Sequence, residues 1–335
     1  MGSYRFTHAW VFVLFASVIA VAGFKTGRAG RHAQNRPATP SGSESTRMDK
    51  TGDVAGLPAA TKPAPGAGSK SSDLAGFVAA ASRNSELQTS LVWSFGGKQQ
   101  RGWSLYAPLI ANLTGSDVNA TESAFAMRLS LWQKQNSIEP NGVLDGDTWS
   151  RMISAFQSQR MNVHSYPAPG ELVTIPTADC YDPTRAEELR KVDPETLAAY
   201  RRVIAAAAAD PSLGLQVAGK DQLAPGEKFL RVVSAFRSHE YQDQLRKQSP
   251  NSGRAGLAIN SPHSTGRALD LYVGGEPVST KDGNRALQTE TPVYRWLVKN
   301  ASRFGFQPYF YEPWHWEYVG VGSDAVTRGR GDTVK

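Results

Sequence analysis

Apolar positions in the middle of the chain indicate helices and one pair of strands. Between Phe125 and Trp132 they are three or four residues apart, which predicts a helix. Residues 91–113 predict two short strands joined by a Gly-Gly turn, followed by another helix. The polar stretch 141–149 predicts a turn and a loop that lead into one more helix. Residues 73–165 are therefore expected to form a small, mostly helical domain.

Residues that favour helix caps indicate where helices begin. The side chains of Asp, Ser and Thr accept backbone hydrogen bonds at a helix start, and proline fits the first helical position. Such starts are expected at Asp147 or Thr148, at Asp193 before Pro194, at Ser238, and at Thr291 before Pro292. Gly305 is expected to end the last of these helices.

Two apolar stretches between the later helices have the composition of strands. Residues 228–236 predict one strand, and residues 268–273 predict another, in which Asp270 interrupts an otherwise apolar run. No internal repeat is apparent. Helices mixed with short strands predict an α+β fold for residues 166–325, with a small antiparallel sheet flanked by helices.

The N-terminus is dominated by an apolar run of 16 residues, 9–24, which follows Arg5 and His8 and includes the small-residue site Ala-Val-Ala ending at Ala22. This pattern is typical of a secretory signal. The alternative is an uncleaved anchor, although the run is shorter than the roughly 20 residues that span a bilayer comfortably. Residues 1–24 therefore predict export to the periplasm or cell wall, and any contact with the membrane is expected through this segment alone.

Composition defines two further segments. Residues 25–72 are rich in Gly, Pro, Ala, Ser and Thr and have no apolar period, which predicts a disordered linker because such a chain buries too little to offset the entropy of ordering. Residues 326–335 predict a basic tail. A linker after an export signal suggests that the folded part has to reach its target.

Charge and cysteine content narrow the class of protein. The 335 residues are 40% hydrophobic, which is enough for a packed core. A net charge of +7 is too small to indicate nucleic acid as a partner. The one cysteine, Cys180, excludes an intramolecular disulfide and a cysteine-based metal site. A monomer is expected.

Candidate chemistry begins with His263 and Asp270. Alternation places Asp270 on the face of its strand opposite to Leu269 and Leu271. A buried carboxylate has to be paired, hydrogen-bonded or bound to a metal. Gly266 permits a tight bend that could bring His263 near Asp270. This stretch alone leaves open whether the two form a simple hydrogen bond or part of a metal site.

A second stretch, 309–320, favours the metal. Alternation places His315 and Glu317 on one face of a strand, while Glu312 precedes Pro313, which ends or bends the strand. Two histidines and one carboxylate leave an open position on tetrahedral zinc, as catalytic sites require. A nearby free glutamate could take a proton from water. An aromatic-rich edge strand without a metal is the alternative.

These residues give the C-terminal half a resemblance to a known family. Ser261, His263, Gly266, Ala268 and Asp270 match Ser-x-His-x-x-Gly-x-Ala-x-Asp, and Glu312 with His315 matches Glu-x-x-His. Residues from about 190 to 320 thereby resemble the zinc D-alanyl-D-alanine carboxypeptidases and dipeptidases that trim peptidoglycan. The family's upstream Arg-Ser element corresponds to Arg237 and its neighbours.

The resemblance implies a role for each of these residues. His263, Asp270 and His315 would hold one zinc ion per catalytic domain, and Glu312 would be the general base. Arg237 would steady the oxyanion or the substrate carboxylate, although it could also be an ordinary surface residue. Ser261 and Gln242 would contact the substrate. Glu317 is either a rival base or a support for a zinc ligand.

The segment before this domain resembles a different family. The helix end at Leu129, Trp132 and Gln133, the loop 142–146, and Thr148-Trp149 resemble three-helix peptidoglycan-binding modules. An ordinary small helical domain is the alternative. Together the two resemblances imply an exported zinc peptidase that acts on peptidoglycan. A D,D-dipeptidase, a stem-peptide endopeptidase and a non-catalytic zinc-stabilised wall-binding protein remain alternatives.

Overall fold

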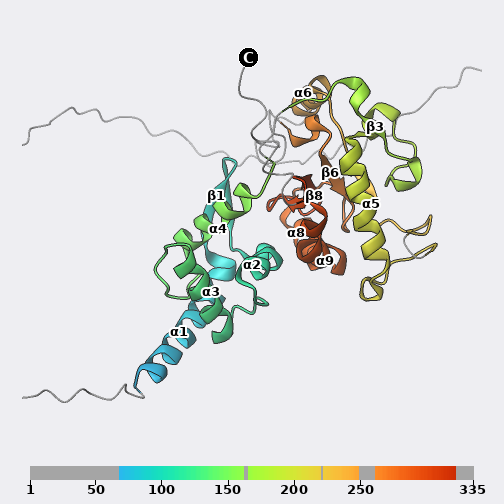
Figure 1. Cartoon of the computed structure of the whole chain (residues 1–335). Helices are drawn as coiled ribbons and strands as arrows, with labels where there is room; N and C mark the ends of the chain where they lie inside the picture. Colours follow the sequence, from blue (N-terminus) through green and yellow to red (C-terminus); the bar gives the residue numbers. More distant parts are fainter. Residues whose placement is uncertain (1–67, 162–164, 220–221, 249–260, 322–335) are drawn as a thin grey trace, which may run out of the picture. The chain divides into compact units, whose positions relative to one another are not determined.

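The structure is a computed structural model that describes residues 68–161, 165–219, 222–248 and 261–321 (Figure 1). The predicted signal or anchor (1–24), nearly all of the predicted linker and the basic tail lie outside these residues. The described elements in chain order are α1 (Gly68–Ser90), β1 (Val92–Phe95), β2 (Lys98–Arg101), η1 (Ser104–Tyr106), α2 (Ala107–Thr114), α3 (Ser123–Gln135), α4 (Gly146–Ser158), η2 (Pro169–Glu171), β3 (Val173–Thr174), η3 (Thr177–Asp179), η4 (Glu187–Arg190), β4 (Lys191–Val192), α5 (Pro194–Ala208), η5 (Pro211–Leu213), β5 (Val232–Ser234), α6 (His239–Gln248), η6 (Pro262–Thr265), β6 (Ala268–Leu271), α8 (Asp282–Glu290), α9 (Pro292–Asn300), η7 (Ala301–Phe304), β7 (Phe306–Pro308) and β8 (His315–Tyr318).

Residues 68–161, the helical segment, contain four α-helices and the β1–β2 hairpin. Helix α1 begins at Gly68, so residues 68–72 are helical and not part of a linker as predicted. Helix α4 is capped by Asp145, whose Oδ1 accepts a hydrogen bond from the backbone N–H of Thr148 at 2.9 Å. The helix therefore begins slightly before the expected Asp147 or Thr148, because Asp145 has the extended backbone that a cap needs.

The loop before α4 is held by two buried amide side chains. Gln133 donates to the Val143 carbonyl and accepts from the backbone N–H of Gly142. Asn84, on α1, donates to the Gly142 carbonyl and accepts from the backbone N–H of Leu144. Several positions that resemble a wall-binding module thus have a structural task in this segment. Whether the segment also binds the wall remains a prediction.

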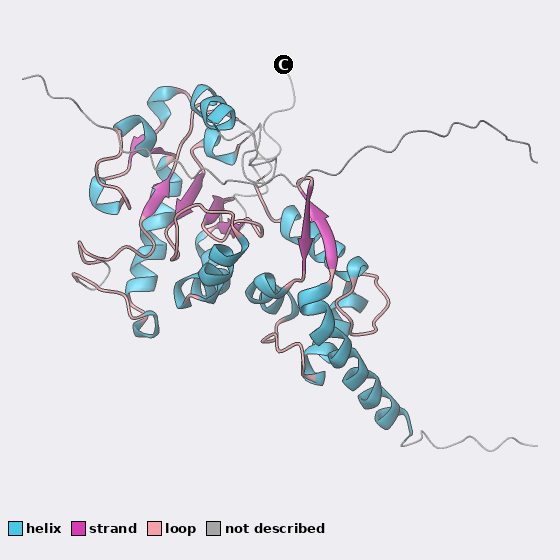
Figure 2. Ribbon diagram, turned by 180° about the vertical axis from the view of Figure 1, so that it is seen from behind, coloured by secondary structure: helices cyan, strands magenta, loops and turns pink. Residues whose placement is uncertain are grey.

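A four-stranded antiparallel sheet lies at the centre of the C-terminal half, in the order β5-β6-β8-β7 (Figure 2). Strand β6 lies inside the sheet, between β5 and β8, as its apolar run predicts. Its Leu269 and Leu271 are buried. Strand β5 covers only Val232–Ser234 of the predicted stretch 228–236, since Leu230 has a positive φ of 65° that interrupts the extended backbone.

Helices α5, α8 and α9 lie beside this sheet (Figure 1). The starts of α5 and α9 agree with the predicted caps: Asp193 accepts from the backbone N–H of Thr196, and Thr291 accepts from that of Tyr294. On α9, Tyr294 packs against Trp316 of β8 with ring centroids 6.3 Å apart. The predicted α+β fold class, a small antiparallel sheet flanked by helices and preceded by a mostly helical part, is confirmed.

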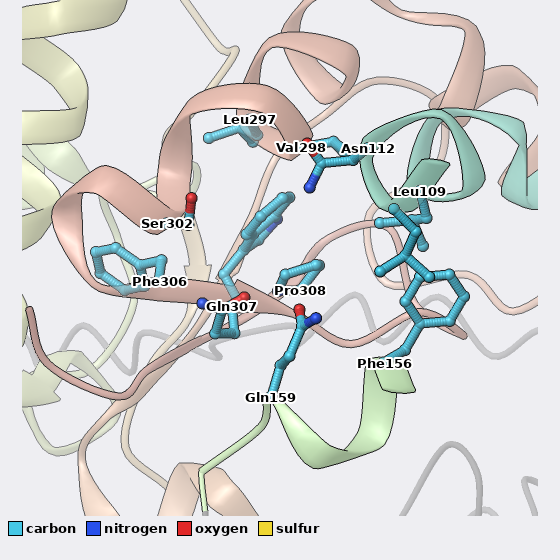
Figure 3. A pocket seen from close by; sticks show the side chains of 12 residues that line it. Leu109, Asn112, Phe156, Gln159, Leu297, Val298, Ser302, Phe306, Gln307 and Pro308 are labelled. Atoms are coloured by element: carbon cyan, nitrogen blue, oxygen red, sulfur yellow. The ribbon is translucent and has the colours of Figure 1, made fainter. Parts of the chain in front are cut away.

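All described residues belong to one compact unit. Within it the helical segment contacts the sheet through aromatic side chains. Phe310, which follows β7, stacks on Phe156 of α4 with centroids 6.0 Å apart and packs edge-on against Phe95 of β1 at 4.7 Å. Figure 3 shows a small pocket at this contact, with Leu109 and Phe156 on one side and Leu297 and Pro308 on the other.

Two further features of the described residues concern the cysteine and the helices. Cys180 is a buried free thiol. Apart from the gaps given above, none of the helices in residues 68–321 combines the length and the apolar character that a membrane span requires.

Candidate metal centre

The register of the central strands places two of the candidate ligands side by side. Asp270 on β6 is paired directly with His315 on β8, and Ala268 is paired with Glu317. Side chains directly opposite each other in an antiparallel pair lie on the same face of the sheet. Asp270 and His315 therefore project together, and the small Ala268 leaves room for the carboxylate of Glu317 beside them.

A tight turn adds the third candidate ligand. His263 lies in η6, which ends at Gly266 with a positive φ of 73°. A Cβ at this position would lie 2.7 Å from Leu172 Cδ2 and 3.0 Å from the Asp193 nitrogen, so only glycine fits. The turn leads into β6 and brings His263 back over Asp270, as the spacing of the two residues predicts.

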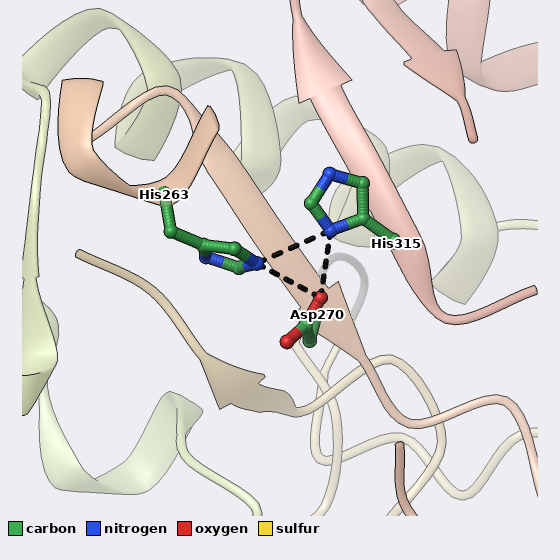
Figure 4. Close-up of side chains that lie close together, drawn as sticks. All are labelled: His263, Asp270 and His315. Carbon is green, nitrogen blue, oxygen red and sulfur yellow. Dashed lines mark hydrogen bonds and ion pairs between the residues drawn. The ribbon is translucent and has the colours of Figure 1, made fainter. Parts of the chain in front are cut away.

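The three side chains converge on one point (Figure 4). His263 Nε2 lies 3.1 Å from Asp270 Oδ1 and 3.1 Å from His315 Nδ1, and His315 Nδ1 lies 3.0 Å from Asp270 Oδ1. All three residues are buried. These spacings are close to the roughly 3.3 Å between ligand atoms on a tetrahedral zinc ion with bonds of about 2.0–2.1 Å.

The hydrogen bonds behind the rings decide which nitrogens face inward. His263 Nδ1 lies 2.7 Å from the carbonyl oxygen of Ala235, and His315 Nε2 lies 3.2 Å from Glu317 Oε1. Carbonyl and carboxylate oxygens only accept, so these two nitrogens carry the protons. His263 Nε2 and His315 Nδ1 are then the ring nitrogens that face each other and Asp270. A cation is the natural occupant of such a site, and the group could hold a metal ion.

Glu312 sits in the turn between β7 and β8. Its backbone N–H donates to the Tyr309 carbonyl at 3.1 Å, and its own carbonyl accepts from the backbone N–H of His315 at 3.0 Å. The side chain is buried, and the charges of His315, Asp270 and Arg237 affect the pKa of its carboxyl. Pro313 and this turn separate Glu312 from β8, so it lies beside the three-residue cluster without being part of it.

The comparison with protein families bears on residues 191–321. They match the family model VanY, described as D-alanyl-D-alanine carboxypeptidase. This segment belongs to that family. The resemblance of the C-terminal half, the VanY segment, is thereby confirmed, and the family implies a peptidase. A comparison of the chain with curated proteins gave no match. The matched residues include the three converging side chains and Glu312.

The remaining predicted site residues of the VanY segment lie in different surroundings. Arg237 is not a surface residue: its side chain is only 13% exposed, its Nη2 donates to Asp270 Oδ2, and its Nε donates to Ser234 Oγ at 3.0 Å. Gln242 on α6 and Ser261 just before η6 are both buried.

Charges and burial set the protonation of the cluster in the VanY segment. Burial lowers the pKa of His263 to about 4, with a further contribution from the charge of Arg237. Burial alone would lower the pKa of His315 too, but hydrogen bonds to Asp270 and Glu317 raise it to about 9. Burial would raise the pKa of Asp270, yet His263 and Arg237 hold it well below its usual range. Asp270 is therefore anionic at neutral pH.

Two contacts to this centre were missed by sequence reasoning. Arg160 donates to Glu317 Oε1 from Nε at 2.9 Å and also from Nη2, and the backbone N–H of Met161 donates to Glu317 Oε2 at 3.0 Å. Burial would raise the pKa of Glu317, but hydrogen bonds and charges of His315 and Arg160 lower it to about 2. Glu317 is thus a partner of His315, which was one of its two predicted roles. Nothing in the sequence around Arg160 points to Glu317.

The pKa of Glu312 shifts in the opposite direction. Burial raises its pKa from 4.5 to about 8, with Asp270 adding to the effect. The fold therefore favours the protonated form. The resulting contribution to the stability of the metal-free protein is complete below about pH 4.5, declines as the pH rises, and is lost above about pH 8.

This shift leads to a prediction for the metal-free protein. Glu312→Gln resembles the protonated form at every pH, so it and the wild type should melt at similar temperatures near pH 5. At pH 9 the variant should melt several degrees higher, because it carries no buried negative charge. Thermal unfolding in chelator from pH 5 to pH 9 measures the difference. A gap in melting temperature that does not change with pH would contradict the assigned shift.

Proposed function

We propose that the protein is an exported, zinc-dependent D-alanyl-D-alanine carboxypeptidase that removes terminal D-alanine from the stem peptides of peptidoglycan. The observation that carries this proposal is the convergence of His263, Asp270 and His315 within a segment of the carboxypeptidase family. Export is supported by the predicted signal in residues 1–24 and suits a substrate in the cell wall.

Zinc is the metal that fits the donor set best. Two imidazole nitrogens and one carboxylate oxygen are the ligands of many catalytic zinc sites, which keep a fourth position open for water or substrate. Calcium and magnesium prefer oxygen donors, and this cluster offers only one. A zinc ion held by these residues would supply a Lewis acid that polarises the scissile carbonyl and activates water at neutral pH.

Glu312 is proposed as the general base. It lies beside the three ligands, three residues before His315, and it does not have to bind the metal itself. A buried carboxyl whose pKa is raised toward the working pH can accept a proton from the attacking water and return it to the leaving amine. Glu317 is unsuited to this task, because Arg160, Met161 and His315 already hold its two oxygens.

Arg237 is proposed to act on both the protein and the substrate. Its bond to Asp270 Oδ2 orients a ligand whose other oxygen faces the cluster. A guanidinium carries five N–H groups, and those not used by Asp270 and Ser234 can bind the terminal carboxylate of a peptide or a developing oxyanion. Gln242 and Ser261 are proposed to contact the substrate.

Product analysis on a defined stem peptide tests the bond that is cleaved. The zinc-loaded protein is incubated with a muropeptide that ends in D-alanyl-D-alanine, and the products are weighed by mass spectrometry. Loss of a single alanine is expected. Loss of the dipeptide would identify a D,D-dipeptidase, and internal cleavage an endopeptidase. An unchanged substrate would favour a wall-binding protein that keeps zinc for folding.

A further inference from the structure

The carboxylate of Glu317 is held largely by residues from outside the VanY segment. Three of its hydrogen bonds come from Arg160 and from the backbone N–H of Met161, and the fourth comes from His315 Nε2. Arg160 and Met161 follow α4 and precede the matched residues 191–321 by about thirty positions. The helical segment therefore reaches the hydrogen-bond partner of a candidate metal ligand.

The carboxylate of this pair is fully buried. The side chain of Glu317 is 0% exposed, and that of Arg160 is 21% exposed. A carboxylate taken out of water needs a cation and hydrogen bonds to offset its lost hydration. Among the described residues, Arg160 is the arginine or lysine that forms an ion pair with Glu317. Without it, the carboxylate would keep only its hydrogen bonds from the Met161 backbone N–H and from His315 Nε2, and no ion pair with an arginine.

Arg160 supports His315 from a second direction. Its guanidinium lies over the ring of Tyr309 at 4.0 Å from the centroid, a favourable cation–π distance. The Tyr309 ring in turn packs edge-on against the imidazole of His315, with centroids 5.9 Å apart and planes at 82°. One side chain thus contacts both the carboxylate and the ring that border His315.

The neighbouring residue reaches the turn of another candidate ligand. Thr265, two positions after His263, has its Oγ1 3.7 Å from Sδ of Met161. Arg160 and Met161 together therefore contact the surroundings of both His315 and His263.

Neighbouring contacts hold Arg160 in place. Arg160 Nη1 donates to Gln157 Oε1 at 3.2 Å, and Phe156 one turn earlier stacks on Phe310. A separate tie is made by Arg285, which is 1% exposed and donates to Tyr106 Oη at 3.2 Å and to the Tyr311 carbonyl at 3.1 Å. The helical segment is thereby fixed against the turn that carries Glu312.

We infer that Arg160 is a positioning residue for the metal centre, acting on His315 through Glu317, so that the helical segment completes the site of the VanY segment. This inference rests on the zinc site proposed above. Partners behind a metal-bound histidine fix its ring and raise its basicity, and their loss typically weakens metal affinity or activity about 10–100-fold.

The test uses the full chain and measures zinc affinity by chelator competition. Arg160→Ala should bind zinc about 10–100-fold more weakly than the wild type. Arg160→Lys should lose less, because it keeps the charge but not the forked donor. Arg151→Ala is the matched control: this arginine lies exposed on α4 and should leave affinity unchanged. The visible spectrum of the cobalt-loaded protein should change for Arg160→Ala alone.

A double-mutant cycle tests the route through Glu317. In a Glu317→Gln background, replacing Arg160 by Ala should cost much less affinity than in the wild type, because the partner carboxylate is gone. If Arg160→Ala fails to fold, as judged by circular dichroism, Arg160→Gln takes its place in every comparison. Unchanged zinc affinity in the folded variant, or an equal loss in both backgrounds, would overturn the inference. A wild type that binds no zinc would instead refute the proposed metal centre.

Discussion

Glu312→Gln is expected to keep zinc and the fold while losing nearly all turnover. The amide has nearly the same shape as the carboxyl, but it cannot accept a proton from water at neutral pH. Positioned general-base assistance is typically worth about 10²–10⁴-fold, so kcat should fall by that factor while KM changes little. Steady-state kinetics on a peptide ending in D-alanyl-D-alanine, with metal content measured on the same samples, gives the result.

Glu317→Gln is the control for this substitution. It removes a carboxylate at the same centre, but one that is already engaged by Arg160 and Met161. A milder loss of turnover is expected, accompanied by weaker zinc binding because His315 loses its charged partner. An inactive Glu317→Gln next to a normally active Glu312→Gln would mean that the base is the other carboxylate.

Replacing either candidate histidine ligand is expected to have the largest effect of all. His263→Ala and His315→Ala each remove one of three converging donor atoms. Both variants should lose stoichiometric zinc and all measurable turnover, a greater loss of affinity than removal of a supporting partner causes. The holoprotein should also melt at a higher temperature than either variant, since a ligand bound only by the folded state stabilises it.

His239→Ala provides the matched control. His239 lies exposed at the start of α6 and packs against Tyr166, with ring centroids 4.2 Å apart. Its removal should change neither zinc content nor turnover. Full zinc occupancy in His263→Ala or His315→Ala, measured after dialysis against metal-free buffer, would show that the ligand set is wrong.

Local signals in the sequence predict much of the fold. Asp193 and Thr291 cap helices where their types predict, because capping depends on a few neighbouring residues. Gly305 ends the 3-10 helix η7 and not α9 as predicted, because α9 already ends at Asn300. Helix α1 was missed: its early turns carry few large apolar residues, and Asn84 is held by a loop about sixty positions away. The short β5 was overestimated, since the positive φ of Leu230 depends on tertiary context and not on its own preference.

In the candidate site, too, local sequence patterns predict some residues and miss others. His263, Asp270 and His315 could be proposed from sequence, because alternation along two strands and one glycine turn suffices to orient them. The function of Arg160 could not, because its partner Glu317 is 157 positions away and no local pattern links them. The contact of Arg237 with Asp270 could not be predicted from the sequence either. The distance between these two side chains depends on how β5 and β6 pair.

The central claim, a zinc-dependent release of D-alanine at this site, is tested most directly by one titration. Metal-free protein receives increasing amounts of zinc, and D-alanine released from a peptide ending in D-alanyl-D-alanine is measured at each step. The release rate should be near zero without zinc, rise in proportion to added metal, and level off at about one equivalent, as a single three-ligand site requires. Full activity without metal, or no D-alanine at any ratio, would contradict the account.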